Sequence, residues 1–115
     1  MSFRPRIGEW VNPQIINTSG KISLLRVHDV GSKYGPSSDE LDAEVIVQLS
    51  NQPDRAFGFE LRDNDNGLVN QGMLQLLIEA YRNNWDVGIA FWEYSKLGYS
   101  DKKKNCPILR VWLKK

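Results

Sequence analysis

The stretch RDNDNGLVNQGM, residues 62–73, contains the carboxylate and amide oxygens that calcium prefers as ligands. An EF-hand loop requires such oxygens at its first, third and fifth positions, glycine at the sixth and glutamate at the twelfth. With Gly67 as the sixth residue, Arg62 takes the first position and Met73 the twelfth. A cation and a thioether then stand where carboxylates are required, so we predict no metal site here.

The same stretch is better explained as a hinge between a strand and a helix. Asn66 and Gly67 both tolerate positive φ, which predicts a tight turn at this pair. Asn70 is a suitable cap for the helix that follows.

Side chains suited to catalysis are few. His28 is the single imidazole, and no nucleophile, phosphate-loop or dinucleotide motif accompanies it. Cys106, just before Pro107, is interpreted as a small filler at the edge of a strand rather than a nucleophile. Carboxylates are numerous, but no pair is singled out. We therefore predict a protein that is not an enzyme, with no catalytic residue and no cofactor.

Tyrosine and lysine occur together in two segments rich in turn residues, 31–40 and 95–105. A tyrosine beside lysines can combine ring stacking with charge, as in proteins that bind single-stranded nucleic acids. The predicted ligand-binding residues are Tyr34, Tyr99, Lys102, Lys103 and Lys104.

Hydrophobic periodicity predicts the elements that position these side chains. Strands are expected at residues 21–30, 42–49, 55–62, 85–92 and 107–115, and an amphipathic helix within 72–84. The adjacent Leu24 and Leu25 predict a bulge or bend in the first strand, and Asn83-Asn84 predicts a left-handed helix end. Residues 1–20 show no clean period and are interpreted as an N-terminal arm, followed by one domain over residues 21–115.

Three strands, a helix and two further strands follow the order of an OB-fold, a small five-stranded β-barrel. The alternative is an open sheet with the helix lying across it. In an OB-fold, ligands bind between the loops that join strands one to two and four to five. Those loops are the two segments that contain the tyrosines and lysines.

Alternation along the strands predicts which side chains point away from the core. Leu109, Val111 and Leu113 are expected to point inward, and Ile46, Trp92, Ile108, Arg110 and Trp112 outward. Large aromatic side chains and arginine often anchor interfaces, so Trp92, Arg110 and Trp112 are the predicted interface residues. The alternative is that the N-terminal arm, with Phe3, Ile7 and Trp10, covers them.

The composition is that of one globular domain of 115 residues, without an apolar run near the length of about 20 that a membrane helix needs. The single cysteine and the absence of an apolar run behind the first arginines predict a cytoplasmic protein without a secretory signal. The charge is uneven: residues 1–94 carry a net −5 and residues 95–115 a net +6. This asymmetry indicates either an anionic partner for the C-terminal region or ion pairing within the molecule.

The pattern FELRDNDN, then GMLQLLIEAYRNNWDVGIAFWEY, then PILRVWL resembles the core of the B subunits of pentameric bacterial toxins of the cholera and pertussis type. The resemblance covers about half of the chain and lies in element order and hydrophobic pattern. It implies an OB-fold, ring-shaped oligomers and binding of sugars. The chain departs from that family in having no cysteine pair.

The function expected from the sequence is that of a non-catalytic binding or assembly module that forms a homo-oligomer and binds a glycan or another small ligand. The alternative is an OB-fold protein that binds single-stranded nucleic acid. The net charge of only +1 does not favour this alternative.

Overall fold

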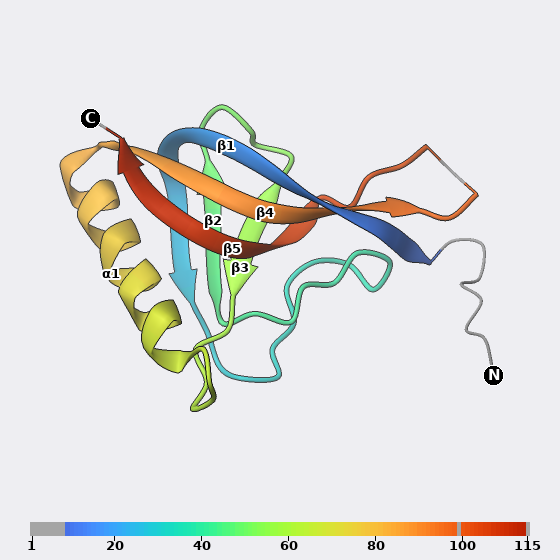
Figure 1. Cartoon of the computed structure of the whole chain (residues 1–115), viewed down its shortest axis with the longest axis horizontal. Coiled ribbons are helices and arrows are strands. Elements are labelled where there is room, and N and C mark those ends of the chain that lie inside the picture. The colour runs from blue at the N-terminus through green and yellow to red at the C-terminus, as the bar shows by residue number, and fades with distance from the viewer. Residues whose placement is uncertain (1–8, 99, 115) are drawn as a thin grey trace.

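The computed structural model describes residues 9–98 and 100–114. Five strands and one helix lie within these residues, in the predicted order (Figure 1). Their bounds are β1 Trp10–Val27, β2 Val45–Leu49, β3 Ala56–Phe59, α1 Gly67–Asn83, β4 Asp86–Lys96 and β5 Asn105–Lys114. The protein is mainly β, as predicted.

The five strands close into a ring in the order β1-β2-β3-β5-β4, with β4 pairing back to β1. Within residues 9–98 and 100–114, β3 and β5 are the one parallel pair, over three residue pairs from Ala56↔Asn105 to Gly58↔Pro107. The other pairings are antiparallel. Ring closure removes most of the unpaired strand edges that an open sheet would leave. The alternative of an open sheet is therefore wrong.

Strand β1 serves both halves of the ring. Its first part pairs with β4, from Trp10↔Lys96 to Lys21↔Asp86, and its last part pairs with β2. The register shifts between Ile22 and Leu24, which confirms the predicted irregularity in this strand.

The predicted start of the first strand near residue 21 is wrong. Residues 10–20, assigned to the arm, are strand because β4 supplies backbone hydrogen-bond partners along their length. Pro13 is accommodated where the register shifts between Val11 and Gln14, beside Asn12, whose φ is 53°. Phe3 and Ile7 of the expected arm lie outside the described residues.

The main core fills the ring. Its buried residues are Val45, Val47, Leu49, Phe57, Phe59, Met73, Leu77, Ala80, Val87, Ile89, Phe91, Cys106 and Ile108. The rings of Phe57 and Phe91 lie 4.8 Å apart between centroids, and each such buried side chain stabilises the fold by about 1.5–3 kcal/mol. Met73, Leu77 and Ala80 bring α1 onto this core.

One assignment of strand faces is wrong. Ile108, expected to point outward, is buried in the core, and Leu109 is not part of it. The register between β4 and β5 shifts between Ala90 and Phe91, and such a bulge reverses the alternation beyond it. Val111 and Leu113 pack against the core, as predicted.

A second, smaller core covers the outer face of β2 and β3. The β1–β2 loop, residues 28–44, places Leu41 and Ala43 over Ile46, which is fully buried, and over Ala56. Ile46 points away from the main core, as predicted, but the loop covers it, so that it is buried rather than exposed. Gly58 makes this cover close-fitting, because a Cβ there would lie 2.7 Å from the carbonyl oxygen of Val45 and 2.9 Å from Leu41 Cδ2.

The hinge before α1 is confirmed, although its details differ from the prediction. Asn66 has φ −97° rather than a positive value, and the turn is made by Asn64, whose side-chain and backbone oxygens accept hydrogen bonds from the Asn66 and Gly67 amides at 3.0 Å. The helix begins at Gly67, so Asn70 lies within it and donates instead to the carbonyl of Glu60 at 2.7 Å. Asn84 ends the helix with φ 56°, as predicted.

Candidate ligand cleft between the β1–β2 and β4–β5 loops

The β1–β2 loop and the β4–β5 loop, residues 97–104, lie side by side at the end of the molecule away from α1 (Figure 1). Asp39 joins them. Its carboxylate forms an ion pair with Lys103 Nζ and accepts a hydrogen bond from the Lys104 amide at 2.8 Å. The Asn105 side chain donates to the Asp39 carbonyl, also at 2.8 Å. These contacts hold one loop against the other.

Trp10 lies where the two loops meet. Its indole Nε1 donates to the carbonyl of Ser38 at 3.1 Å. The ammonium groups of Lys96 and Lys103 each lie 5.5 Å from the centroid of its ring, within cation–π range. Trp10 thus anchors the start of β1 to the β1–β2 loop.

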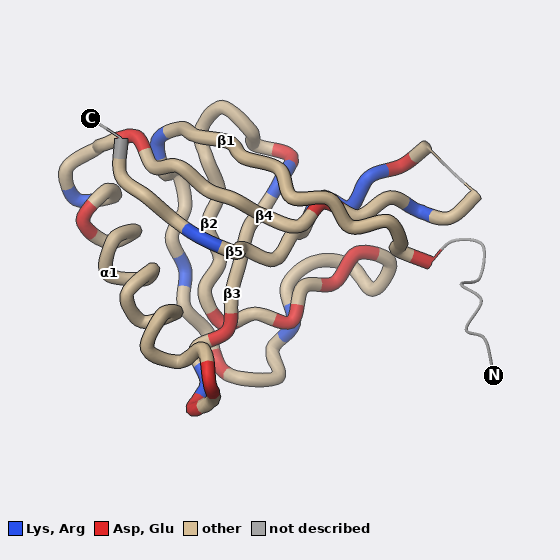
Figure 2. Tube along the Cα trace, viewed as in Figure 1, with Lys and Arg blue, Asp and Glu red and all other residues tan. Residues whose placement is uncertain are grey.

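A cavity of about 390 Å³ lies between the loops. Its lining residues are Trp10, Pro36, Ser38, Asp39, Lys96, Asp101, Lys102 and Lys104. Three lysines face two aspartates, and one of these carboxylates, Asp39, already has Lys103 as its partner. The lining therefore carries an excess of positive charge, and Figure 2 shows the basic and acidic positions of the two loops.

Lys102 is held in place by Glu93 of β4. Lys102 Nζ lies 3.2 Å from Glu93 Oε1, and Arg55 Nη1 lies 2.9 Å from Oε2. Partial burial acts to raise the pKa of Glu93, but hydrogen bonds from Lys102 and Arg55 outweigh it, so this pKa is lowered from its usual 4.5. Glu93 is consequently ionised at neutral pH and orients Lys102 at the rim of the cavity.

The structure places two of the five predicted ligand residues in the cavity lining and two elsewhere, and the fifth is not described. Lys102 and Lys104 line the cavity. Lys103 lies beneath it, 7% exposed, with its ammonium bound to Asp39 and to the Glu40 carbonyl. Tyr34 pairs with Leu41 and packs against the second core rather than lining the cavity. Tyr99 lies outside the described residues.

Sequence reasoning missed Trp10 as a cleft residue, because it predicts an arm over the outer sheet face there, and the structure places Trp10 at the cleft instead. The local pattern could not reveal this, because the partner of Trp10 is Ser38, far along the chain. Lys96 lies in the predicted loop segment 95–105 and lines the cleft, although it is not among the five predicted ligand residues.

Arg62 organises a second polar cluster, at the end of β3. It hydrogen-bonds Glu44, which is 3% exposed, through Nε and Nη2 at 2.9 Å each, and it also contacts Asp42 and Glu60. The hydrogen bonds to Glu44 and then Asp42 raise the pKa of Arg62 above its usual range. This cluster ties the hinge to the segment before β2.

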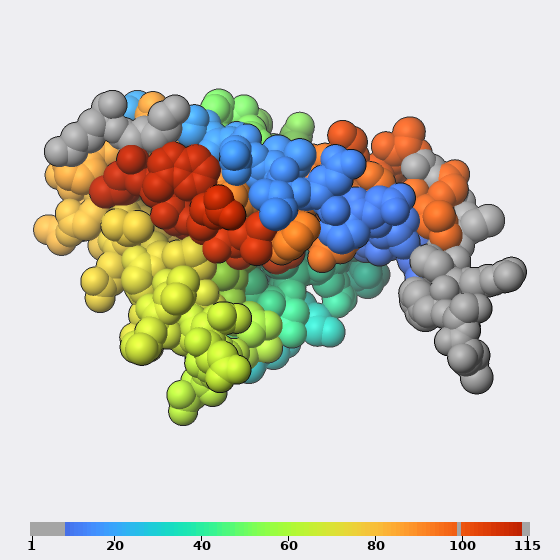
Figure 3. Space-filling model, viewed as in Figure 1, coloured from blue at the N-terminus to red at the C-terminus, as the bar shows by residue number. Residues whose placement is uncertain are grey.

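The predicted interface residues lie on the outer face of β4 and β5. Trp92 pairs with Ile15, Arg110 with Ala90 and Trp112 with Gly88. The Trp112 indole lies directly over Gly88, since a Cβ at this glycine would be 2.0 Å from Trp112 Cε2. In the space-filling view, β1 and β5 form a band across this side of the molecule, above α1 (Figure 3).

Neither His28 nor Cys106 lines the cavity between the loops. Both ring nitrogens of His28 are buried, and they find no hydrogen-bond partner within the described part of the chain. Burial raises the pKa of the Cys106 thiol to about 11, and its sulfur donates to the Lys103 carbonyl at 3.2 Å. A thiol in this state is a poor nucleophile at neutral pH.

Across residues 9–98 and 100–114, no helix has the length and apolar character needed to cross a membrane. No family model, no curated protein and no solved structure matches the chain.

Proposed function

We propose that the protein is a non-catalytic binding module on an OB-fold, with its ligand site in the cleft between the β1–β2 and β4–β5 loops. The strand order, the helix between β3 and β4, and the shared use of β1 by both halves of the ring support this fold. The relationship to the B subunits of pentameric toxins belongs to the same proposal and is supported by element order alone. A cytoplasmic location also remains part of the proposal.

The ligand that fits the cleft is small and anionic, such as an acidic or phosphorylated sugar. One observation carries this: Trp10 and the three lysines at 96, 102 and 104 line a single cavity. Lysines attract the charge, and the indole offers the flat apolar surface on which sugar rings commonly pack. The cavity, at about 390 Å³, has the size of a small-ligand site.

Titration with an acidic sugar tests the proposal, using sialyllactose as the probe and lactose as the neutral comparison. Resonances of the Trp10 indole and of the β4–β5 loop should shift in an NMR titration with sialyllactose. The K102A/K104A variant should bind at least about 10-fold more weakly, because each lysine contributes on the order of 1 kcal/mol to binding an anion.

The matched control is R26A/R82A, which removes two exposed basic side chains that do not line the cavity. It should bind like the wild type. Equal losses in both variants would show a nonspecific effect of charge and would contradict the proposal.

Single-stranded nucleic acid is the competing ligand, and the three lysines are the feature that favours it. In OB-folds that bind oligonucleotides, the nucleic acid binds on the outer face of β2 and β3. Here Leu41, Ala43 and Tyr34 cover that face. We therefore expect no binding of a labelled oligonucleotide at low salt, where electrostatic binding is strongest.

Assembly into a homo-oligomer is the second part of the proposal. The support is the outer face of β4, β5 and β1, where Arg110 and Ile15 are exposed beside Trp92 and Trp112. Aromatic and arginine side chains beside an exposed isoleucine have the composition of an interface centre. A molecular mass that rises with protein concentration is the expected observation.

A further inference from the structure

We propose that a groove between β5 and the first turns of α1 binds an extended peptide that carries arginine or lysine. The groove has a volume of about 360 Å³ and shares no lining residue with the cleft between the loops. The inference is independent of the proposed anionic ligand, because this groove is negatively charged whereas the cleft between the loops is positively charged.

The groove lies beside the edge of β5, at the point where the pairing of β5 with β3 ends. The pairing of β3 with β5 ends at Gly58↔Pro107, and β3 itself ends at Phe59, whereas β5 continues to Lys114. Within the described residues, no strand pairs with this side of β5 beyond Pro107. Ile108 and Leu109 line the groove at this point. An extended peptide placed here would continue the position of β3 and pair with the backbone of β5.

The charge of the groove is acidic. Asp42 and Glu60 line it, and none of its lining residues is a lysine or an arginine. Both carboxylates contact Arg62, but that guanidinium makes two hydrogen bonds to the buried carboxylate of Glu44. Among the residues that the structure describes, one cation thus faces three carboxylates, which leaves a net charge of −2 beside the groove.

The two groove carboxylates remain accessible. The side chain of Asp42 is 50% exposed and that of Glu60 is 41% exposed. Arg62 contacts Oδ1 of Asp42 and Oε1 of Glu60, and the second oxygen of Glu60 has only a long contact of 3.5 Å with Asn64 Nδ2. A basic side chain can therefore bind these groups without displacing Arg62.

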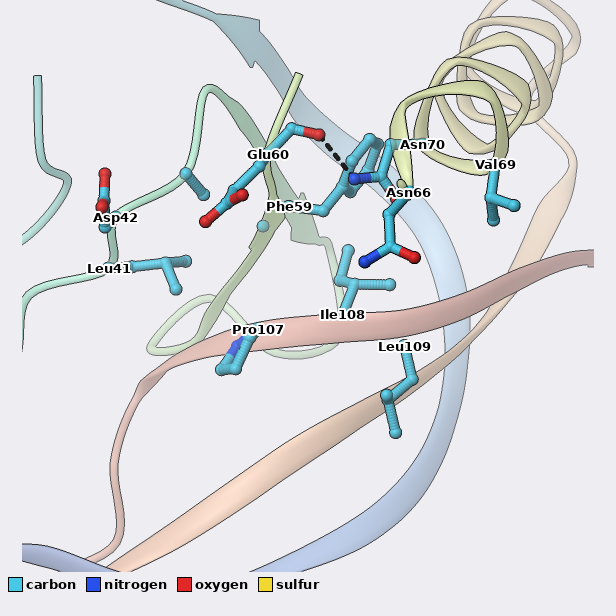
Figure 4. A pocket seen from close by; sticks show the side chains of 12 residues that line it. Leu41, Asp42, Phe59, Glu60, Asn66, Val69, Asn70, Pro107, Ile108 and Leu109 are labelled. Carbon is cyan, nitrogen blue, oxygen red and sulfur yellow. Dashed lines mark hydrogen bonds between the residues drawn. The ribbon is translucent and has the colours of Figure 1, made fainter. Parts of the chain in front are cut away.

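The opposite side of the groove is apolar and carries amides. Figure 4 shows Asn66, Val69 and Asn70 of the α1 side facing Ile108 across the groove, with Asp42 and Glu60 further along it. Val69 is 62% exposed, and the Asn66 side chain does not cap the helix. Alternate side chains of an extended peptide point to opposite faces, so a basic residue can meet the acids while its neighbours contact Val69 and the floor of the groove.

Fluorescence anisotropy with the labelled peptide acetyl-Val-Arg-Val-Arg-Val-amide tests the inference at low salt. The wild-type protein should bind it, and the D42N/E60Q variant should bind at least about 10-fold more weakly. The control D29N/D54N removes the same charge from exposed positions outside the groove and should bind like the wild type.

Two further measurements separate a bound strand from a nonspecific charge effect. The V69K variant places a cation at the exposed rim without disturbing the core, and it should also bind at least about 10-fold more weakly. A peptide N-methylated at alternate amides keeps its charge but loses its strand-pairing donors, and it should not bind. Unchanged binding of D42N/E60Q, of V69K or of the methylated peptide would overturn the inference, as would equal weakening of the D29N/D54N control.

Discussion

At the scale of single residues, glycines and charged pairs decide how the outer sheet face and the cleft are built. Gly88 lets the Trp112 indole lie flat against β4. Glu93 pairs with both Arg55 and Lys102 and so holds Lys102 at the rim of the cleft. The local sequence does not reveal the role of Gly88 or of Glu93, because their partners lie on other segments of the chain.

Replacing Gly88 by alanine should destabilise the protein by about 1–3 kcal/mol, because the new Cβ overlaps the Trp112 ring. Gly72→Ala is the matched control: it lies inside α1 with no atom within 4 Å of the new Cβ, and it should stabilise the protein by about 1 kcal/mol. Urea unfolding of both variants measures the two effects. A G88A protein as stable as the wild type would mean that Trp112 does not lie on β4.

The lowered pKa of Glu93 predicts a pH dependence of stability. A carboxylate whose pKa is depressed in the folded state stabilises that state above its unfolded pKa, near 4.5, and this contribution is lost as pH falls through the folded pKa. The free energies of unfolding of wild type and E93Q should therefore differ at pH 6, and this difference should shrink as the pH falls below about 4.5. The control is E79Q, which keeps Glu93 and its partners. The difference in the free energy of unfolding between the wild type and E79Q should not shrink in this way.

At the scale of elements, long-range contacts join segments that the sequence pattern treats as separate. The β1–β2 loop covers the outer face of β2 and β3, and Asp39 joins this loop to the β4–β5 loop. The lysine run at residues 102–104 is therefore not a uniformly solvated segment. Two of its side chains line the cleft, and the third is buried beneath Trp10.

Removing the Asp39 carboxylate should loosen both loops. The D39A variant leaves Lys103 buried without its ion-pair partner, and we expect a loss of about 3 kcal/mol in the free energy of unfolding. The Lys104 amide loses its acceptor and should exchange with solvent faster. Asp101→Ala changes an exposed carboxylate in the same cavity and serves as the control. Slow exchange at Lys104 in D39A would contradict the role given to Asp39.

At the scale of the whole molecule, the ring separates two surfaces of different character. The cleft with its lysines lies at the end away from α1 (Figure 2). The outer face of β1, β4 and β5 runs along the molecule (Figure 3) and carries Trp92 and Trp112. The residues proposed for assembly, Ile15 and Arg110, do not line the cleft, so the proposed assembly would leave the cleft lining uncovered at these positions.

The I15D/R110E variant should be monomeric where the wild type associates, because it places a charge at an exposed apolar position and reverses another on the same face. Size-exclusion chromatography with light scattering over a range of concentrations measures this. The control is L68D, a change at an apolar residue that is 86% exposed on α1. A wild-type protein that stays monomeric at the highest concentration would contradict the proposed assembly, and dissociation of L68D alone would move the interface to the helix.

The sequence alone determined the kinds and the order of the elements and the left-handed helix end at Asn84, because hydrophobic periodicity and turn chemistry act between near neighbours in the chain. It also pointed to the two loops that form the cleft. Only the tertiary structure decided that Trp10 joins that cleft, that Lys103 is buried and that Ile108 replaces Leu109 in the core. These outcomes depend on the contact of Trp10 with Ser38, the pair of Lys103 with Asp39 and the shifted register of β4 with β5. Each brings together residues that are distant in the chain, and no local pattern specifies such a contact.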